Sequence, residues 1–375
     1  MSRRLNVLQL INVRWYNACA YYAVTLSSAL RRRGHQVTVA GDPSSPPLLK
    51  AKALGLSVHE DLCLSHTSPW MIAYNVKRIG DLVEREDIDL VNAHRGESHL
   101  VAALAKKVGK RAVPLVRTRG DVRAPKDNFF SRYLNGALTD GIITTCEVLK
   151  KSYIENLQMP EDKVTSVPVG VDTDVFSPRE SDETWKEKLS IPQGSLVVGI
   201  VGRLSPVKGH RYFIQAAEHV LKQLPGVTFV ICGEDAQIKA EQLKREVGDK
   251  NIEGNFRFLG RVKDVREIIS VFDVGVVCSV GSETICRVAL ECMSMGKPVV
   301  GTGVNAIPEV VRHRINGLVV EPKNPQELAS AIIELLRDGE MRKKFGERSR
   351  STVMEEFTMD AFAQKTEQIY LGLLD

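Results

Sequence analysis

The strongest constraint on the fold is an alternation of short apolar runs with longer amphipathic stretches along most of the chain. Such alternation predicts stacked βαβ units, because each strand of a parallel sheet is followed by a crossover helix. In the first half, the expected strands are NVLQLI (6–11), QVTVA (36–40), LSVHE (56–60), LVNAH (90–94), VPLVR (113–117) and GIITTC (141–146). In the second half, they are SLVVGIVG (195–202), VTFVICG (227–233), FRFLG (256–260), VGVVCS (274–279), KPVVGTG (297–303) and GLVVE (317–321). The pattern therefore indicates the α/β class with doubly wound parallel sheets.

The alternation breaks between about Val167 and Pro192, where Pro, Gly and charged residues replace the apolar runs. A chain of 375 residues also exceeds what one hydrophobic core usually serves. We therefore expect two Rossmann-like domains, residues 1–180 and 190–356, facing across a deep cleft. Ligands of such sheets bind at the carboxyl ends of the strands, so the chemistry is expected in the loops that follow them.

The composition is that of an ordinary globular protein, with 43% hydrophobic and 26% charged residues. No apolar run approaches the roughly 18 residues that cross a bilayer, and the amino end turns polar too early for a secretory signal. The seven cysteines show no CxxC spacing, which indicates core positions in a reducing compartment and not zinc ligands or disulfides. We therefore expect a cytoplasmic protein.

The net charge of +5 is concentrated in the first half, where residues 1–178 hold 24 Lys and Arg against 18 Asp and Glu. Two interpretations of the basic clusters stay open. They are solvated helix faces, or they touch anionic lipids on the cytoplasmic face of the inner membrane. Nucleic acid is disfavoured as a partner, because the isoelectric point is near 8.7 and no aromatic and basic motif is interleaved.

One loop, VGRLSPVKGH (201–210), follows an expected strand and leads into a helix that begins near His210. Arg203 and Lys208 are then two cations beside the amino end of a helix, whose free N–H groups and dipole favour anions. The loop has the outline of a diphosphate site. The alternative is a plain surface loop with two solvated cations.

A second segment, SETICRVALECMSMGKPVV (282–300), carries two glutamates. Glu283 lies in the loop after a strand, and Glu291 lies inside the following helix, which Gly296 ends. A carboxylate at such a place can accept hydrogen bonds from the vicinal hydroxyls of a ribose or from a sugar. By itself the pair is also compatible with a solvated helix face.

Taken in order, these motifs resemble the family 4 retaining glycosyltransferases. The resemblance rests on GVDTDVFSP (170–178), GRLSPVKG (202–209), FLGRVKD (258–264), SETICRVALE (282–291) and IPEVVRHRINGLVVEP (307–322), and it covers nearly the whole chain. It implies the two-domain GT-B architecture, with the last helix, about 357–375, packing back on the first domain. It also implies a nucleoside-diphosphate sugar donor, with a UDP-sugar favoured, and a glycan or glycolipid acceptor. The implied setting is the assembly of lipopolysaccharide core or another envelope polysaccharide.

Carried over by position, the resemblance implies that Arg203 and Lys208 bind the donor diphosphate, so that no metal or other cofactor is needed. Glu283 would meet the donor sugar near the reacting carbon, and Glu291 would bind the ribose. Backbone amides of Thr284–Arg287 would form a helix amino end that faces the distal phosphate. The implied catalytic residues are Arg203, Lys208 and Glu283. The implied donor-binding residues are Gly202, Arg203, Lys208, Thr284, Ile285, Cys286, Arg287 and Glu291.

The chain departs from the family pattern in three places. Asn17 and Ala18 stand where a Gly-Gly pair is frequent, and Cys286 stands where a second glycine is frequent. Arg119 occupies the position after the fifth strand where a histidine is frequent, so we expect His94, after the fourth strand, to line the same cleft.

The segment LVRTRGDVR places Arg117, Arg119 and Arg123 near the expected end of a strand. One interpretation is that the three arginines, with Asn17 and His94, line an acceptor site for an anionic glycan. The other is that they form salt bridges to Asp121 and Asp127. Both stay open at this level.

Other functions are compatible with parts of the pattern. A sugar-nucleotide epimerase or hydrolase would bind the same donor without an acceptor, and a silent nucleotide-sugar-binding protein would not turn it over. A dinucleotide oxidoreductase is disfavoured, because GIVGRL (199–204) lacks the three-glycine fingerprint. The ordered motifs favour transfer.

Overall fold

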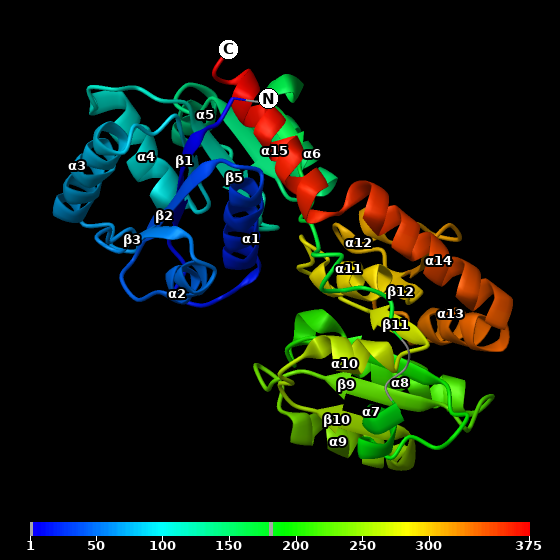
Figure 1. Cartoon of the computed structure of the whole chain (residues 1–375). Helices are drawn as coiled ribbons and strands as arrows, with labels where there is room; N and C mark the ends of the chain where they lie inside the picture. The colour runs from blue at the N-terminus through cyan, green and yellow to red at the C-terminus, as the bar shows by residue number, and fades with distance from the viewer. Residues whose placement is uncertain (1–2, 180–182) are drawn as a thin grey trace. The chain divides into compact units, whose positions relative to one another are not determined.

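The computed structural model describes residues 3–179 and 183–375. The chain divides into two compact units (Figure 1). The first extends to Gly170 and includes Met359–Asp375, and the second is Val171–Thr358. The division at Gly170 falls inside the segment where the sequence pattern breaks. The expected end of the first domain, residue 180, lies outside the described residues.

The first unit is built on a parallel sheet of seven strands in the order β3-β2-β1-β4-β5-β6-β7 across the described residues. Its strands are β1 (Asn6–Ile11), β2 (Gln36–Gly41), β3 (Ser57–His59), β4 (Leu90–Ala93), β5 (Leu115–Arg119), β6 (Gly141–Thr144) and β7 (Val164–Ser166). Its helices are α1 (Ala18–Arg32), α2 (Pro46–Ala53), α3 (Pro69–Arg85), α4 (Gly96–Val108), α5 (Phe129–Gly136), α6 (Glu147–Leu157), the 3-10 turn η1 (Glu161–Lys163) and α15 (Met359–Gly372). The strands pair only in parallel, which is why their apolar runs are continuous.

Helix α1 shows how the sequence sets the ends of an element. The side chain of Asn17 accepts a hydrogen bond from the backbone N–H of Ala20 at 3.0 Å, which satisfies a free donor of the first turn. The last turn carries Arg31 and Arg32, and Gly34 follows at a φ of 94°. The cations of the last turn and the left-handed Gly34 are therefore the local features that end this helix.

Helix α15 closes the first unit. Its Tyr370 hydroxyl is buried and accepts hydrogen bonds from the side-chain amides of Asn92 at 2.7 Å and Gln9 at 3.4 Å. The Phe362 ring meets the Tyr22 ring edge-on, with centroids 4.9 Å apart. Because these contacts bury one face of α15 against β1, β4 and α1, the last helix is part of this core.

The second unit contains a parallel sheet of six described strands in the order β10-β9-β8-β11-β12-β13. The strands are β8 (Val197–Val201), β9 (Thr228–Cys232), β10 (Phe256–Leu259), β11 (Val274–Val277), β12 (Val299–Thr302) and β13 (Gly317–Val320). The helices are α7 (Glu183–Lys188), α8 (His210–Leu221), α9 (Ala240–Gly248), α10 (Val265–Ser270), α11 (Arg287–Ser294), α12 (Ile307–Val310), α13 (Pro325–Arg337) and α14 (Gly339–Glu356), with 3-10 turns η2 (Pro206–Lys208) and η3 (Glu253–Asn255).

Aromatic side chains fill the core of the second unit on one side of its sheet. The rings of Phe213, Phe229 and Phe256 lie within 6.4 Å of one another, centroid to centroid. Elsewhere in this unit, Gly199 of β8 lies under Phe272, whose ring atoms would be only 2.1 Å from an added Cβ. The glycine in GIVG is therefore explained by close packing and not by a nucleotide fingerprint.

The predicted fold class is confirmed, and all twelve predicted strands are found. The structure adds β7, whose three residues are too few for a periodic signal. It also extends β5 to Arg119, so that Arg117 lies inside the strand and not at its end. None of the described helices has the length and apolar character of a membrane-spanning segment.

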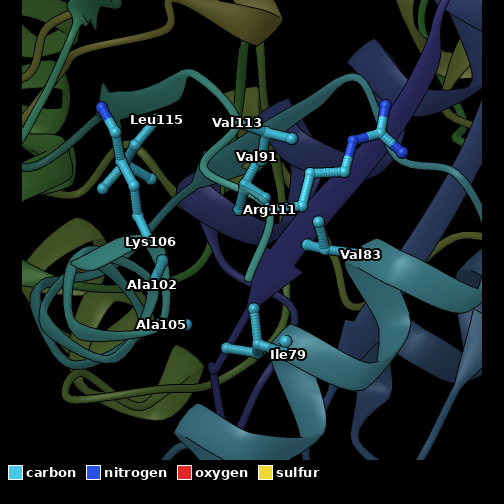
Figure 2. Close-up of a pocket in the computed structure, with 10 residues that line it drawn as sticks. Ile79, Val83, Val91, Ala102, Ala105, Lys106, Arg111, Val113 and Leu115 are labelled. Carbon is cyan, nitrogen blue, oxygen red and sulfur yellow. The ribbon is translucent and has the colours of Figure 1, made fainter. Parts of the chain in front are cut away.

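A void of about 10 Å³, which is room for one water molecule, lies between α3, α4, β4 and β5 (Figure 2). Its walls are mostly apolar, and the charged ends of Lys106 and Arg111 point away from it. The apolar lining residues are Ile79, Gly80, Val83, Val91, Ala102, Ala105, Val113 and Leu115.

Gly80→Ala is expected to stabilise the first unit by about 1 kcal/mol, the usual difference between the two residues inside a helix. Gly80 lies in the middle of α3, and a Cβ added there meets no heavy atom within 4 Å. The free energy of unfolding from urea titration is the measurement. Gly96→Ala is the matched control with a smaller expected gain, because Gly96 also has open space but begins α4. A lower stability of Gly80→Ala would contradict the packing described.

Candidate functional site

The loop after β8 is shaped by glycine. Gly209 has a φ of 76° and begins α8 as its cap, and an added Cβ would lie 2.0 Å from the carbonyl oxygen of Cys278. Only glycine fits this left-handed position against the backbone after β11. The short turn η2 precedes it and ends at Lys208, so the side chain of Lys208 is set beside the residues that follow β11.

Lys208 and Glu283, which are far apart in the sequence, form an ion pair between Nζ and Oε2. Glu283 is buried, and its Oε2 also accepts a hydrogen bond from the Ser279 hydroxyl at 2.8 Å. The backbone N–H of Glu283 donates to Oδ1 of Asn305 at 3.3 Å, and Ala306 N–H donates to the Glu283 carbonyl at 3.1 Å. The carboxylate is therefore held on several sides, while the ammonium group keeps donor capacity for another anion.

Arg203 lies in the same loop with its side chain exposed. Within residues 3–179 and 183–375 its guanidinium has no hydrogen bond or ion pair. Its planar donor fork is therefore available to an incoming anion, for which bidentate binding to phosphate is a common use. The structure keeps Arg203 and Lys208 on one loop but does not bring them into contact.

Glu291 is buried in α11, where Oε1 lies 3.1 Å from Nε of Arg287. Its Oε2 is buried and, among the described residues, accepts no hydrogen bond. Burial raises the pKa of the Glu291 carboxyl, and the Arg287 charge offsets part of this rise. An unsatisfied buried carboxylate oxygen costs free energy, and a hydroxyl donor from a ligand would remove that cost.

The predicted helix amino end at Thr284–Arg287 needs correction. Helix α11 begins at Arg287, and Thr284, Ile285 and Cys286 form the turn before it. Cys286 adopts a left-handed conformation with a φ of 44°. This is the conformation that glycine favours, so the chain keeps the expected backbone shape at this position although it carries a side chain there.

A cavity of about 330 Å³ lies at the carboxyl ends of β9 and β10. Leu204, the neighbour of Arg203, forms one wall, and Phe258 to Arg261 of the FLGRVKD segment form another. Sequence reasoning identified this segment as a motif but assigned no site residue in it. Its position after a strand was the signal that could have done so. The other lining residues are Ile231, Gly233, Glu234, Asp235, Ala240 and Lys244.

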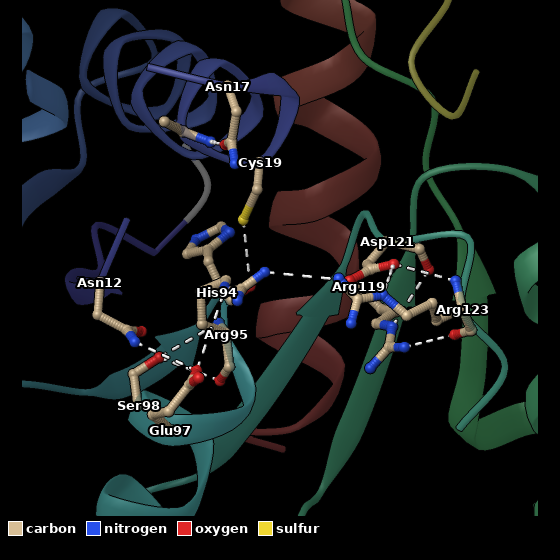
Figure 3. A network of polar contacts seen from close by, with 11 residues as sticks. Asn12, Asn17, Cys19, His94, Arg95, Glu97, Ser98, Arg119, Asp121 and Arg123 are labelled. Carbon is tan, nitrogen blue, oxygen red and sulfur yellow. Dashed lines mark hydrogen bonds and ion pairs between the residues drawn. The ribbon is translucent and has the colours of Figure 1, made fainter. Parts of the chain in front are cut away.

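In the first unit, arginines gather at the carboxyl ends of β4 and β5 (Figure 3). Arg95 lies 3.8 Å from Glu97 and 4.0 Å from Asp121, and Arg123 lies 3.5 Å from Asp121. Arg119 donates to the carbonyl oxygens of Asp121 and Arg123 and so holds the loop after β5. With Arg117, this edge holds four guanidinium groups and, among the described residues named here, two carboxylates, those of Glu97 and Asp121. The edge therefore has an excess of positive charge.

Arg117 differs from the expectation of an accessible cation. It is 4% exposed, and its guanidinium donates to the carbonyl oxygen of Ala93 at 3.0 Å. Burial lowers the pKa of Arg117. The salt-bridge interpretation is correct for Arg123 and Asp121, whereas Asp127 pairs with Arg132 at 2.7 Å.

His94 and Asn17 have structural contacts. His94 is 2% exposed, and its Nε2 lies 2.7 Å from Oε1 of Gln9. Burial, with a smaller effect of Arg117, lowers the pKa of His94 to about 3, so the ring is neutral at physiological pH. Its Nδ1 and the Asn12 Oδ1 are buried at this edge without partners in the described chain. Asn17 caps α1.

Two family models match the chain one after the other. The model described as Glycosyltransferase Family 4 matches residues 20–175, and the model described as Glycosyl transferases group 1 matches residues 181–352. The chain belongs to the group 1, family 4 glycosyltransferases.

Curated glycosyltransferases resemble the chain over most of its length. An N-acetyl-alpha-D-glucosaminyl L-malate synthase from Bacillus anthracis is 25% identical, and the match covers 79% of this chain and 78% of that protein. A D-inositol 3-phosphate glycosyltransferase from Corynebacterium jeikeium is 27% identical over 75% of this chain and 72% of that protein.

Solved glycosyltransferases share the fold. A glycosyltransferase from Rickettsia africae has a TM-score of 0.91 at 20% identity and covers both chains fully. Anabaena HepE, solved in complex with UDP, has a TM-score of 0.84 at 20% identity over 98% of this chain and 100% of that one. A further HepE structure contains UDP-glucose. The two parallel-sheet domains of this glycosyltransferase are thus those of the GT-B fold.

In this glycosyltransferase, the predicted donor residues lie at the carboxyl edge of the second sheet. Contacts join Lys208 to Glu283 and Arg287 to Glu291. The predicted acceptor residues belong to the first unit, where Arg119 ends β5, Arg123 lies in the loop after it, and Arg117 and His94 are buried. The roles predicted for all of these residues stay predictions.

Proposed function

We propose that this glycosyltransferase moves a sugar from a nucleoside-diphosphate sugar, UDP-sugar favoured, to an anionic acceptor with retention of the anomeric configuration. The observation that carries the donor part is the group formed by Lys208, Glu283, Arg203 and Glu291 in one unit. Among the described side chains, Lys208 pairs only with Glu283, and Arg203 pairs with no carboxylate. This arrangement supports the binding of a diphosphate.

The proposed chemistry follows from where charge develops. As the glycosyl bond breaks, negative charge builds on the phosphate oxygens of the leaving nucleoside diphosphate. Arg203 and Lys208 stabilise this charge, since preplaced cations need no reorganisation during the reaction. For this reason the proposal includes no divalent metal ion. A phosphate oxygen takes the acceptor proton when attack comes from the face that the leaving group vacates, so no side-chain base is required.

The rest of the donor has matching groups nearby. The free Oε2 of Glu291 suits a ribose hydroxyl. The cavity beside Leu204 has the volume for a nucleobase, and Phe258 offers it an apolar wall. Glu283, held by Lys208 and Ser279, is the proposed contact for the donor sugar.

The proposed acceptor carries negative charge. Arg95, Arg119 and Arg123 leave a positive excess at the edge of the first sheet. Two relatives are named for anionic acceptors, L-malate and D-inositol 3-phosphate. A phosphorylated or acidic glycan or glycolipid of the cell envelope fits this charge. A place in lipopolysaccharide or other envelope-polysaccharide synthesis, on the cytoplasmic side, stays a prediction.

The function is tested by thermal shift and product analysis. A panel of nucleoside diphosphates and nucleotide sugars, with and without EDTA, is expected to give stabilisation by one base series that EDTA leaves unchanged. NMR of the glycoside formed from the stabilising donor is expected to show the donor's anomeric configuration. Loss of stabilisation in EDTA would contradict the metal-free site. Donor conversion to free sugar or to an epimer, with the same rate when acceptors are added, would favour the hydrolase or epimerase alternative.

Arg119→Ala is expected to raise the KM for an anionic acceptor by about tenfold, which corresponds to the usual free-energy contribution of one charge-assisted hydrogen bond. The KM for the donor should stay unchanged, because Arg119 lies in the other unit. Arg111→Ala is the control, since Arg111 pairs with Asp87 away from this edge. If the folded Arg119→Ala protein keeps the wild-type acceptor KM, the anionic-acceptor proposal is wrong.

A further inference from the structure

Helix α5, which is labelled in Figure 1, carries three large aromatic side chains that are exposed to solvent. Phe129 is 85% exposed, Phe130 57% and Tyr133 39%. The Phe129 and Tyr133 rings lie parallel with centroids 6.3 Å apart, so together they form a continuous apolar face. On the opposite side of α5, Leu134 and Asn135 are buried. An isolated exposed apolar residue is ordinary, but three on one short helix mark an interaction surface.

Basic side chains surround this face. Lys107, at the end of α4, places Nζ 5.8 Å from the centroid of the Tyr133 ring, and Lys126 and Arg132 are exposed on either side of Phe129 in the sequence. The acidic residue next to them, Asp127, is paired with Arg132 at 2.7 Å. The other nearby carboxylate, Asp140, is occupied by Lys106. The rim of the aromatic face is therefore positive.

The charges around the aromatic face of α5 indicate which kind of partner binds it. A symmetric contact with a second copy would place Lys107, Lys126 and Arg132 close to their own counterparts, and like charges across an interface are unfavourable. A partner surface that is negatively charged and has an apolar layer beneath it would match both the basic rim and the exposed aromatic side chains. Aromatic rings insert at the level of lipid headgroups, and lysines and arginines bind anionic headgroups.

We propose that α5, with Lys107 and Lys126, docks this protein on an anionic lipid bilayer. Phe129, Phe130 and Tyr133 enter the interfacial layer, and Lys107 and Lys126 contact lipid phosphates. The loop 120–128 joins this helix in the sequence to Arg119 at the end of β5. The inference does not depend on the proposed reaction, because membrane binding is measured without turnover.

The test is co-sedimentation of the whole protein with vesicles. One set consists of phosphatidylcholine, and the other of equal parts phosphatidylcholine and phosphatidylglycerol. The wild type is expected to bind the anionic vesicles at least about tenfold more tightly than the neutral ones, because several basic residues contribute. High salt should weaken this binding. The variant carrying Phe129→Ser and Phe130→Ser, and separately the variant carrying Lys107→Gln and Lys126→Gln, should each lose about tenfold in affinity.

Leu49→Ser is the matched control. Leu49 is 53% exposed on α2, which packs against α1 and not against α5, so its loss should leave vesicle binding unchanged. Circular dichroism and thermal melting confirm that each variant is folded. The proposal is overturned if the wild type does not bind anionic vesicles. It is equally overturned if the folded α5 variants bind as the wild type does, or if Leu49→Ser weakens binding as much as they do.

Discussion

Lys208→Met is expected to lower kcat for sugar transfer by about 100-fold or more, the range seen when one preplaced charge-stabilising donor is removed. Lys208 is held beside the residues after β11 by the Gly209 turn and forms the ion pair with Glu283. The variant keeps the length of the side chain but removes the charge that would meet the leaving diphosphate. The measurement is kcat at saturating donor and acceptor.

The control for this prediction is Lys222→Met. Lys222 ends α8, the helix that follows Lys208, and pairs with the exposed end of Glu218 at 3.2 Å. Its loss should leave kcat unchanged. A Lys208→Met protein that folds and turns over like the wild type would remove Lys208 from the reaction. Lys208→Arg should retain part of the activity, because the charge is kept while the geometry changes.

Glu291→Gln is expected to weaken donor binding by about 10-fold to 100-fold while it makes the unliganded protein more stable. Binding weakens because a neutral amide oxygen accepts a weaker hydrogen bond from a ribose hydroxyl than a carboxylate does. Stability rises because burial raises the pKa of Glu291 above its ordinary value, which means that the folded protein bears a cost for the charged form. Titration calorimetry with UDP and urea unfolding measure the two effects.

The pH dependence of the free energy of unfolding provides a further test of the Glu291→Gln prediction. With a raised pKa in the folded state, the Glu291 carboxyl binds its proton more tightly when folded, so its contribution to stability is larger at acid pH and declines as pH rises through that pKa. The advantage of Glu291→Gln should therefore be greatest at neutral pH. It should shrink as the pH falls through the folded pKa and the wild-type carboxyl becomes neutral. A stability gain that is absent at neutral pH, or unchanged donor affinity, would be inconsistent with a buried ribose-binding carboxylate.

Much of the fold could be predicted because parallel strands buried on both faces leave continuous apolar runs. The runs at β1 and β8 are examples, and the stop of α1 at Gly34 follows from local chemistry. Strand β7 could not be predicted, since three residues give no period. The burial of Arg117 could not be predicted from the sequence either. A strand arginine is stabilised inside the protein by a carbonyl on the neighbouring strand, which only the register of β4 and β5 supplies.

The candidate site could likewise be predicted only in part. Sequence position alone placed Arg203 and Lys208 in a loop after a strand, because strand ends carry ligands in this class. The contact of Lys208 with Glu283 depends on β8 and β11 being neighbours in the sheet, which the sequence does not state. The left-handed Cys286 was predicted only as a departure from glycine, because backbone conformation is not encoded in a single side chain.

Arg203 and Lys208 are proposed to bind the donor diphosphate, and Glu291 is proposed to hold the ribose. A crystal structure of the protein with bound UDP is the decisive test of this binding mode. We expect phosphate oxygens within hydrogen-bond distance of the Arg203 guanidinium and Lys208 Nζ, and a ribose hydroxyl within hydrogen-bond distance of Oε2 of Glu291. A nucleotide bound elsewhere, with both cations still directed to solvent or to Glu283 alone, would contradict it.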